Sequence, residues 1–159
     1  MRILMVCLGN ICRSPIAEGV LQQLAIEAGL DWEVASAGTN GYHTGEAPHK
    51  YSQKICKRYG YDISRQRAAR FKASDFDAYD CIYVMADDVY RDVQQLARNP
   101  ADMQKVQFFL EALHPGGRRE VPDPWYGNEE GYEPVYQLIK EGAQAILAKH
   151  NIITYKENF

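Results

Sequence analysis

The start of the chain predicts a strand, a short loop and a helix in direct succession. Residues 2–7 (RILMVC) are almost continuously apolar, with the length and aliphatic content of a buried β-strand. After a short loop, Ser14 is suited to cap a helix and Pro15 to occupy its first position, and the helical pattern ends at Gly29. The amides of such a loop and helix start can turn toward one anion. The sequence therefore predicts an anion-binding loop at the end of its first strand.

Further apolar runs alternate with helical patterns along the rest of the chain. We expect strands at 32–36, 81–85 and 106–110, and helices at 49–58, 88–99 and 133–149. The segments 37–48 and 115–127 are predicted to be loops. Alternating strands and helices favour an α/β fold with a parallel, right-handed, doubly wound sheet. Ligands bind such sheets at the carboxyl ends of the strands, where the first loop falls.

The composition is that of one ordinary globular domain, expected to span residues 1–159. A net charge of −3 gives no general attraction to nucleic acid or to anionic membranes, and no apolar run has the length of a membrane span. The four cysteines and four histidines lack the paired spacing of a zinc site, so no metal is expected. Because no secretory segment is recognisable, we expect a cytoplasmic protein with reduced thiols.

Cys7 and Arg13 flank five loop residues, which are about enough to wrap their amides around one phosphate. The helix dipole and the Arg13 guanidinium favour a Cys7 thiolate, which is a nucleophile. Arg13 can hold two oxygens of a tetrahedral oxyanion, and Gly9 permits close approach of the backbone. A structural strand-end thiol is the alternative. A nucleoside-triphosphate loop is disfavoured because its second glycine and its Lys-Ser/Thr pair are lacking.

A phosphate ester attacked by a thiolate needs an acid for its leaving oxygen, and Asp123 is the best candidate. It lies between Pro122 and Pro124, which stiffen the segment, and two aromatic residues follow. An ordinary Asp-Pro turn explains the same residues equally well. The local sequence leaves both interpretations open.

Two segments together resemble the low-molecular-weight protein tyrosine phosphatase family: VCLGNICRSPIAE at residues 6–18 and DPWYGN at residues 123–128. The resemblance extends over essentially the whole chain. It implies a flavodoxin-like, three-layer, doubly wound fold with a four-stranded parallel sheet flanked by helices. It also implies hydrolysis of phosphotyrosine in protein substrates through a phosphocysteine, without metal or cofactor. We expect a monomer that acts on such proteins and on neither nucleic acid nor membranes.

Matching positions carry the family's roles onto this chain. The resemblance implies that Cys7 is the nucleophile, that Arg13 clamps the phosphate, and that Asp123 protonates the phenolate and then activates the hydrolytic water. Support of the loop is expected from Asn10, Ser14 and Ser36, with Ser14 also bonded to the Cys7 thiolate. The implied phosphate-binding residues are Leu8, Gly9, Asn10, Ile11, Cys12, Arg13 and Ser14.

The resemblance also concerns redox chemistry and the walls of the pocket. Cys12 is implied to form a reversible disulfide with Cys7, against the alternative of a passive loop residue. An aliphatic residue at Ile11 accompanies phosphotyrosine in this family, whereas arginine phosphatases carry Thr. The walls around the substrate ring are expected from Ile11, Tyr42, His43, Trp125 and Tyr126, although an aromatic residue can equally belong to the core.

Three positions depart from the family pattern, and two other functions stay open. Ala86 follows Met85 where the family usually has Asp, Trp125 replaces a tyrosine, and Arg65 stands where many members have a His that supports Asn10. An arsenate reductase of the same fold would need further cysteines for a disulfide relay, and Cys56 and Cys81 have no close partner in the sequence. A phosphotyrosine-binding module without turnover is the other alternative.

Overall fold

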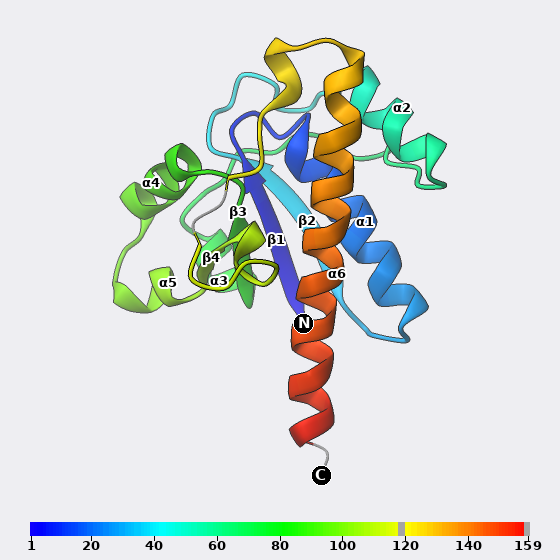
Figure 1. Cartoon of the computed structure of the whole chain (residues 1–159). Coiled ribbons are helices and arrows are strands. Elements are labelled where there is room, and N and C mark those ends of the chain that lie inside the picture. The colour runs from blue at the N-terminus through cyan, green and yellow to red at the C-terminus, as the bar shows by residue number, and fades with distance from the viewer. Residues whose placement is uncertain (118–119, 158–159) are drawn as a thin grey trace.

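The centre of the molecule is a four-stranded parallel sheet in the order β2-β1-β3-β4 (Figure 1). The computed structural model describes residues 1–117 and 120–157. Its strands are β1 (Arg2–Cys7), β2 (Glu33–Gly38), β3 (Cys81–Val84) and β4 (Val106–Phe108). The predicted α/β fold with a four-stranded parallel sheet is confirmed.

Helices cover both faces of the sheet and make three layers (Figure 1). One face packs against α1 (Arg13–Glu27), α2 (Lys50–Arg58) and α6 (Tyr132–Glu157). The other packs against α3 (Asp75–Ala78), α4 (Asp87–Leu96) and α5 (Pro100–Gln104). Short 3-10 helices form at Phe109–Glu111, Pro124–Tyr126 and Glu129–Gly131. Within the described ranges, no helix is both long and apolar enough to span a membrane.

Strand β1 lies between β2 and β3 and is buried on both faces. Ile3, Met5 and Cys7 belong to the core under α1 and α6, whereas Leu4 and Val6 belong to the core on the other side. Both faces of a central parallel strand contact helices, so both must be apolar. This placement accounts for the continuous apolar run at the start of the sequence and brings its end, Cys7, to the carboxyl edge of the sheet.

The start of α1 differs from the expected cap. The helix begins at Arg13, and Cys12 precedes it without a side-chain capping bond. Ser14 is the second helical residue and its hydroxyl contacts Cys7 and Asn10, so the prediction of Ser14 as N-cap and of Pro15 as the first helical residue was wrong. The hydroxyl that could have capped the helix is used inside the loop instead.

Other element boundaries also differ from those expected. The predicted strand at 106–110 ends at Phe108, because the next residues turn into a 3-10 helix. The predicted helix at 88–99 ends at Leu96, and Asn99 caps a separate helix by accepting a bond from the Asp102 N–H. β2 covers 33–38 rather than 32–36, and α6 extends beyond the predicted 133–149. α3 and α5 are too short to show a helical period and were not predicted.

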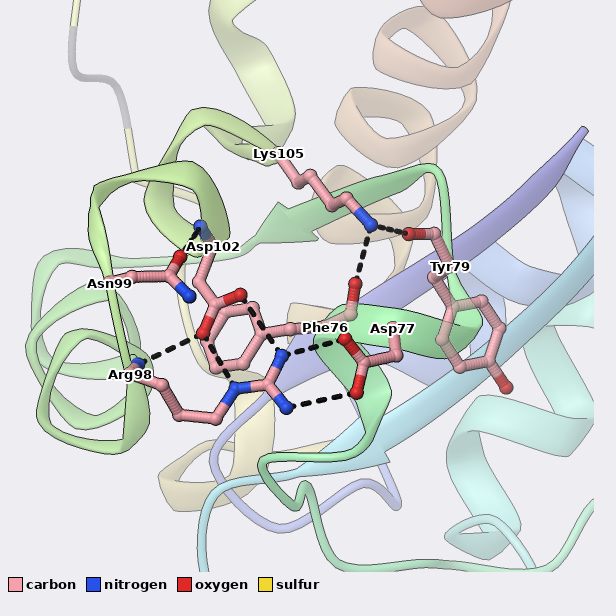
Figure 2. Close-up of polar contacts among 7 residues, drawn as sticks. All are labelled: Phe76, Asp77, Tyr79, Arg98, Asn99, Asp102 and Lys105. Atoms are coloured by element: carbon pink, nitrogen blue, oxygen red, sulfur yellow. Dashed lines mark hydrogen bonds and ion pairs between the residues drawn. The ribbon is translucent and has the colours of Figure 1, made fainter.

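A polar cluster at the opposite end of the sheet from Cys7 connects the helices of the second face (Figure 2). The Arg98 guanidinium donates to both carboxylate oxygens of Asp77, at 2.7 and 2.9 Å, and to both of Asp102, at 3.0 and 3.1 Å. The Lys105 ammonium donates to the carbonyl oxygens of Phe76 and Tyr79, at 2.5 and 3.2 Å. These bonds fix α3 and α5 beside the amino ends of β3 and β4.

Candidate active site

A cavity of about 190 Å³ opens at the carboxyl end of β1. It brings Cys7 and Arg13, which begin and end one loop, together with Asp123 from a distant part of the chain. All the predicted wall residues line it, and Asn40 lines it without having been predicted. The full lining is Cys7, Leu8, Gly9, Ile11, Cys12, Arg13, Asn40, Tyr42, His43, Asp123, Trp125 and Tyr126. We call Cys7–Ser14 the Cys7 loop and residues 121–128 the Asp123 loop.

The Cys7 sulfur is buried among hydrogen-bond donors. Its Sγ lies 2.9 Å from Ser14 Oγ and accepts a bond of 3.3 Å from the Asn10 N–H. Ser14 Oγ itself accepts a bond from Asn10 Nδ2 at 2.8 Å, which directs the Ser14 hydroxyl proton toward the sulfur. Donors aimed at a sulfur stabilise its anionic form. Cys7 Sγ therefore lies among polar groups that can donate to it.

Asn10 holds the Cys7 loop in its bent shape. It is the one non-glycine residue of the described chain with a positive φ, 59°, in the left-handed region that Asn tolerates. Its Nδ2 donates to Ser14 Oγ and to Ser36 Oγ, at 2.8 and 2.9 Å, and its Oδ1 accepts from the Ala69 N–H at 2.9 Å. Three bonds from one buried amide offset the cost of the unusual backbone conformation.

The outward side of the Cys7 loop is bonded to two neighbouring segments. Gly38 lies so close that a Cβ built on it would be 2.9 Å from the Leu8 oxygen, so only glycine fits there. Four carbonyl groups of the loop point outward to these segments. The N–H groups of the same peptides therefore point toward the space beside Cys7 Sγ. The bonded carbonyls are those of Cys7, Leu8, Ile11 and Cys12, and their donors, at 2.8 to 3.1 Å, come from Thr39, Asn40, His49 and Ser52.

Arg13 is a buried cation, only 4% exposed, placed between the Cys7 loop and the Asp123 loop. Its Nη1 donates to the Val121 carbonyl at 3.0 Å, and its Nη2 lies 3.6 Å from Asp123 Oδ2. A guanidinium has five donors, and a buried charge is costly unless they are engaged. The arrangement therefore presents positive charge and free hydrogen-bonding capacity to an anion in the cavity.

A family model described as low molecular weight phosphotyrosine protein phosphatase matches residues 2–154. The chain belongs to this family. It is accordingly an enzyme of the protein-tyrosine-phosphatase class, as the sequence resemblance implied.

Individual relatives of the phosphatase agree over nearly its whole length. A low molecular weight protein-tyrosine-phosphatase of Bacillus subtilis is 36% identical over 151 residues, which are 92% of this chain and 93% of the relative. The low molecular weight phosphotyrosine protein phosphatase of Homo sapiens is 35% identical over 149 residues, covering 92% and 94%. A crystal structure of a protein tyrosine phosphatase from Entamoeba histolytica is 31% identical and superposes with a TM-score of 0.89, covering 97% of this chain and 99% of that one.

The aromatic residues at the cavity of the phosphatase belong to its surface and not to its core. Trp125 is 43% exposed, Tyr126 86% and Tyr42 87%. The Trp125 ring contacts the His43 ring, with centroids 5.5 Å apart, and His43 Nδ1 lies 2.7 Å from a Glu46 oxygen. These side chains are therefore free to contact a ring that enters the cavity.

The remaining cysteines have different surroundings from Cys7. Burial raises the pKa of the Cys12 thiol to about 12, and its sulfur lies 3.5 Å from the Tyr132 hydroxyl. Burial likewise raises the pKa of Cys56, on α2, to about 12. Cys81 pairs with Ile3, at the other end of β1 from Cys7, which places it about 13 Å away along the strand. All four cysteines lie in the described part of the chain and are free.

Two departures from the family pattern can be located in the phosphatase. Arg65 is exposed, and Asn10 receives its third bond from the Ala69 backbone, so that support does not depend on the side chain at 65. Ala86 is buried just before α4. Further along α4, Asp92 accepts a 2.9 Å bond from the Thr39 hydroxyl, beside the loop that lines the cavity.

Sequence reasoning also missed several supporting residues. One of them is Glu18, whose carboxyl accepts a 2.7 Å bond from Ser36. Burial raises the pKa of this carboxyl to about 7. Glu18 lies four residues after Ser14 on the same helix face, which is a usable signal. Gly38, His49, Ser52 and Ala69 act through contacts that only the fold creates. Within the described ranges, no group of three or more His, Cys, Asp or Glu residues is arranged to hold a metal ion.

Proposed function

We propose that this phosphatase hydrolyses phosphotyrosine in proteins through a phosphocysteine intermediate. The observation that carries the proposal is the meeting of Cys7, Arg13 and Asp123 in one cavity with exposed aromatic walls. A thiolate, a guanidinium and a carboxyl supply the nucleophile, the oxyanion clamp and the acid that such a reaction requires. Arg13 and the loop amides provide the positive potential for the phosphate, so the scheme needs no metal or cofactor.

The reaction proceeds in two displacements. Cys7 Sγ attacks phosphorus, the bond to the tyrosyl oxygen breaks, and the Asp123 carboxyl gives its proton to that oxygen. The Asp123 carboxylate then takes a proton from a water that attacks the phosphocysteine, which releases phosphate and restores the thiolate. The amides of residues 8–14 and the Arg13 guanidinium bind the equatorial oxygens in both steps. Asn10, Ser14 and Ser36 keep the loop in shape, as their bonds suggest.

The cavity walls favour an aryl ester. Ile11 presents an aliphatic side chain beside the loop, and Tyr42, Trp125 and Tyr126 can contact the substrate ring. We infer phosphotyrosine-bearing proteins as substrates, and a monomer acting in the cytoplasm as the working form. Neither nucleic acid nor membrane is included as a partner, in keeping with the net charge of −3. Cys12 completes the proposal as a redox partner that forms a disulfide with an oxidised Cys7.

Replacement of the two reacting residues tests the mechanism. Cys7→Ser is expected to abolish hydrolysis of an aryl phosphate and to leave phosphate binding in place. Asp123→Asn is expected to lower kcat/KM by about 10² to 10⁴-fold, the usual contribution of general acid catalysis. Single-turnover assays with a phosphotyrosine peptide and steady-state assays with an aryl phosphate measure the effects of both substitutions. Full activity of Cys7→Ser would rule out the phosphocysteine.

The same assays separate the alternative functions. Phosphoarginine and phosphoserine peptides, assayed beside phosphotyrosine, report the substrate class, and preferential turnover of either would contradict the aryl assignment. Arsenate turnover with thioredoxin is expected to be absent, because Cys81 lies at the far end of the sheet from Cys7 and Cys56 is buried in α2. Binding of phosphotyrosine without steady-state hydrolysis would identify a binding module instead.

A further inference from the structure

His49 contacts the Cys7 loop, the start of α2 and the start of α6 at once. Its backbone N–H donates to the Ile11 carbonyl of the Cys7 loop at 2.8 Å. Its Nδ1 accepts a 3.1 Å bond from the Tyr51 N–H and thereby caps α2. The Tyr132 hydroxyl, at the start of α6, lies 3.4 Å from the same nitrogen, and the two rings stack with centroids 5.7 Å apart. The His49 imidazole is therefore held in place by the backbone bond of the residue, by the bonds of Nδ1 and by stacking on the Tyr132 ring.

The free edge of this imidazole meets the Asp123 loop. The rings of His49 and Trp125 pack edge to face, with centroids 5.4 Å apart and planes at 79°. The His43 ring also packs against Trp125, with centroids 5.5 Å apart, so two imidazole rings contact one indole. The Trp125 backbone N–H donates to Asp123 Oδ1 at 3.0 Å, so the residue that carries the indole is bonded to the candidate acid. Holding the indole therefore also holds the backbone N–H that fixes one oxygen of the Asp123 carboxyl, while the other oxygen lies 3.6 Å from Arg13 Nη2.

The other anchors of the Asp123 loop lie before Asp123. The Val121 N–H donates to the Met85 carbonyl at 2.9 Å, and the Val121 carbonyl accepts from Arg13. After Asp123, the next backbone bond, from Gly127 to the Pro124 carbonyl, is internal to the loop. Together with the buried Pro124, the Trp125 ring therefore connects this second half of the loop to the rest of the protein.

The protonation state of His49 suits this role. Burial, with smaller contributions from Lys50 and His43, lowers the pKa of His49 below its usual value. The ring is therefore neutral at physiological pH, and its Nδ1 lone pair is available to the Tyr51 N–H. A neutral ring also adds no positive charge to the mouth of the cavity, so its effect on the reaction has to come through its contacts.

We propose that His49 is a positioning residue for proton transfer, which holds Trp125 and so aims the Asp123 carboxyl at the leaving oxygen. The proposal rests on the proposed function, since it assigns a supporting residue to the acid of that reaction. A residue of this kind matters most when the leaving group is a poor one, because a good leaving group departs with little help from the acid. It matters least for phosphate binding, which depends on the Cys7 loop and Arg13.

Two substitutions separate the ring contact from the helix cap. His49→Asn keeps a side chain that caps helices well but removes the ring that touches Trp125. His49→Phe keeps an aromatic ring and removes the cap. A purely structural role predicts that the Phe variant is the more damaged of the two, whereas the positioning role predicts selective catalytic damage in the Asn variant.

The experiment compares kcat/KM for phosphotyrosine, a poor leaving group, and p-nitrophenyl phosphate, a good one. His49→Asn is expected to lower the value for phosphotyrosine by about 10-fold and the value for p-nitrophenyl phosphate far less. His49→Phe should keep the wild-type ratio of the two values and show a lower Tm. Trp125→Ala also removes a wall of the cavity, so it should lower both values. Adding His49→Asn to Trp125→Ala should lower kcat/KM for phosphotyrosine no further, because His49 acts through Trp125.

Each remaining outcome counts against a specific claim. Equal losses on both substrates in His49→Asn, a selective loss in His49→Phe, or multiplied losses in the double variant would overturn the positioning role. An unchanged His49→Asn enzyme would overturn it as well. If the wild-type protein hydrolyses neither ester, the proposed function fails first and the role of His49 falls with it.

Discussion

Two arginines of this phosphatase meet carboxylates in different ways. The Arg98 guanidinium uses four of its five donors in bonds of 2.7 to 3.1 Å to Asp77 and Asp102, and its side chain is 42% exposed (Figure 2). The Arg13 side chain is 5% exposed, lies 3.6 Å from Asp123 and donates to one carbonyl. Burial makes the Arg13 charge the more costly of the two to desolvate, yet Arg13 has fewer hydrogen-bond partners than Arg98.

The difference suits Arg98 to a structural role and Arg13 to the phosphate binding proposed above. A guanidinium with four of its five donors bonded within the fold has little to offer a ligand, and ion pairs made by a half-exposed side chain contribute modestly to stability. A buried guanidinium with unused donors gains much from an incoming anion, because the anion supplies the missing charge and acceptors together. The positions agree with this division, since Arg13 lies at the carboxyl end of β1 and Arg98 beside the amino ends of β3 and β4.

The same change at both arginines should have very unequal effects on activity. Lysine keeps the charge but loses the planar fork. Arg13→Lys is expected to lower kcat/KM for an aryl phosphate by about 10² to 10³-fold, as loss of an oxyanion donor does. Arg98→Lys should leave kcat/KM at the wild-type value. Comparable losses in the two variants would contradict the division between them.

Phosphate binding sharpens the comparison without turnover. Inorganic phosphate at 100 times its Kd should stabilise the folded wild-type protein by about 2.7 kcal/mol, through mass action. Arg98→Lys should retain this gain, and Arg13→Lys should lose most of it at the same phosphate concentration. Urea unfolding with and without phosphate measures the gain in unfolding free energy for the wild type and the two variants. Sodium chloride at matched ionic strength is the control. Equal stabilisation of Arg13→Lys would place the anion elsewhere.

The sequence predicted the Cys7 loop better than it predicted the Asp123 loop, and the reason is physical. The nucleophile, the clamp and Asn10 lie within seven residues, between a buried strand and a helix, so local chemistry already defines their arrangement. Asp123 reaches the cavity only because Arg13 and Met85 bond the Val121 backbone. Local sequence therefore left Asp123 undecided between an acid and a turn, and the family resemblance had to supply the choice.

The errors in the predicted fold have similar causes. Ser14 has the properties of a helix cap, but its hydroxyl is taken by Cys7 and Asn10, so tertiary contacts overrode the local preference. α4 ends at Leu96 because the backbone becomes extended at Ala97, and Arg98 then bonds Asp77 of another helix. His49 shows the same limit, because nothing in its neighbourhood in the sequence reveals that it touches both loops of the site.

The smallest expected effect concerns the stability supplied by Arg98. Its hydrogen bonds hold the pKa values of Asp77 and Asp102 below their usual range, so the ion pairs stabilise the fold at neutral pH. Because a lowered carboxyl pKa contributes stability that disappears as the pH falls through it, the loss of Tm in Arg98→Lys should be modest and constant at neutral pH and should shrink below about pH 4. Thermal unfolding of both proteins across this range measures the difference. A gap that stays constant into acid would show that Arg98 acts by packing its stem, and the contrast with Arg13 would then rest on donor geometry alone.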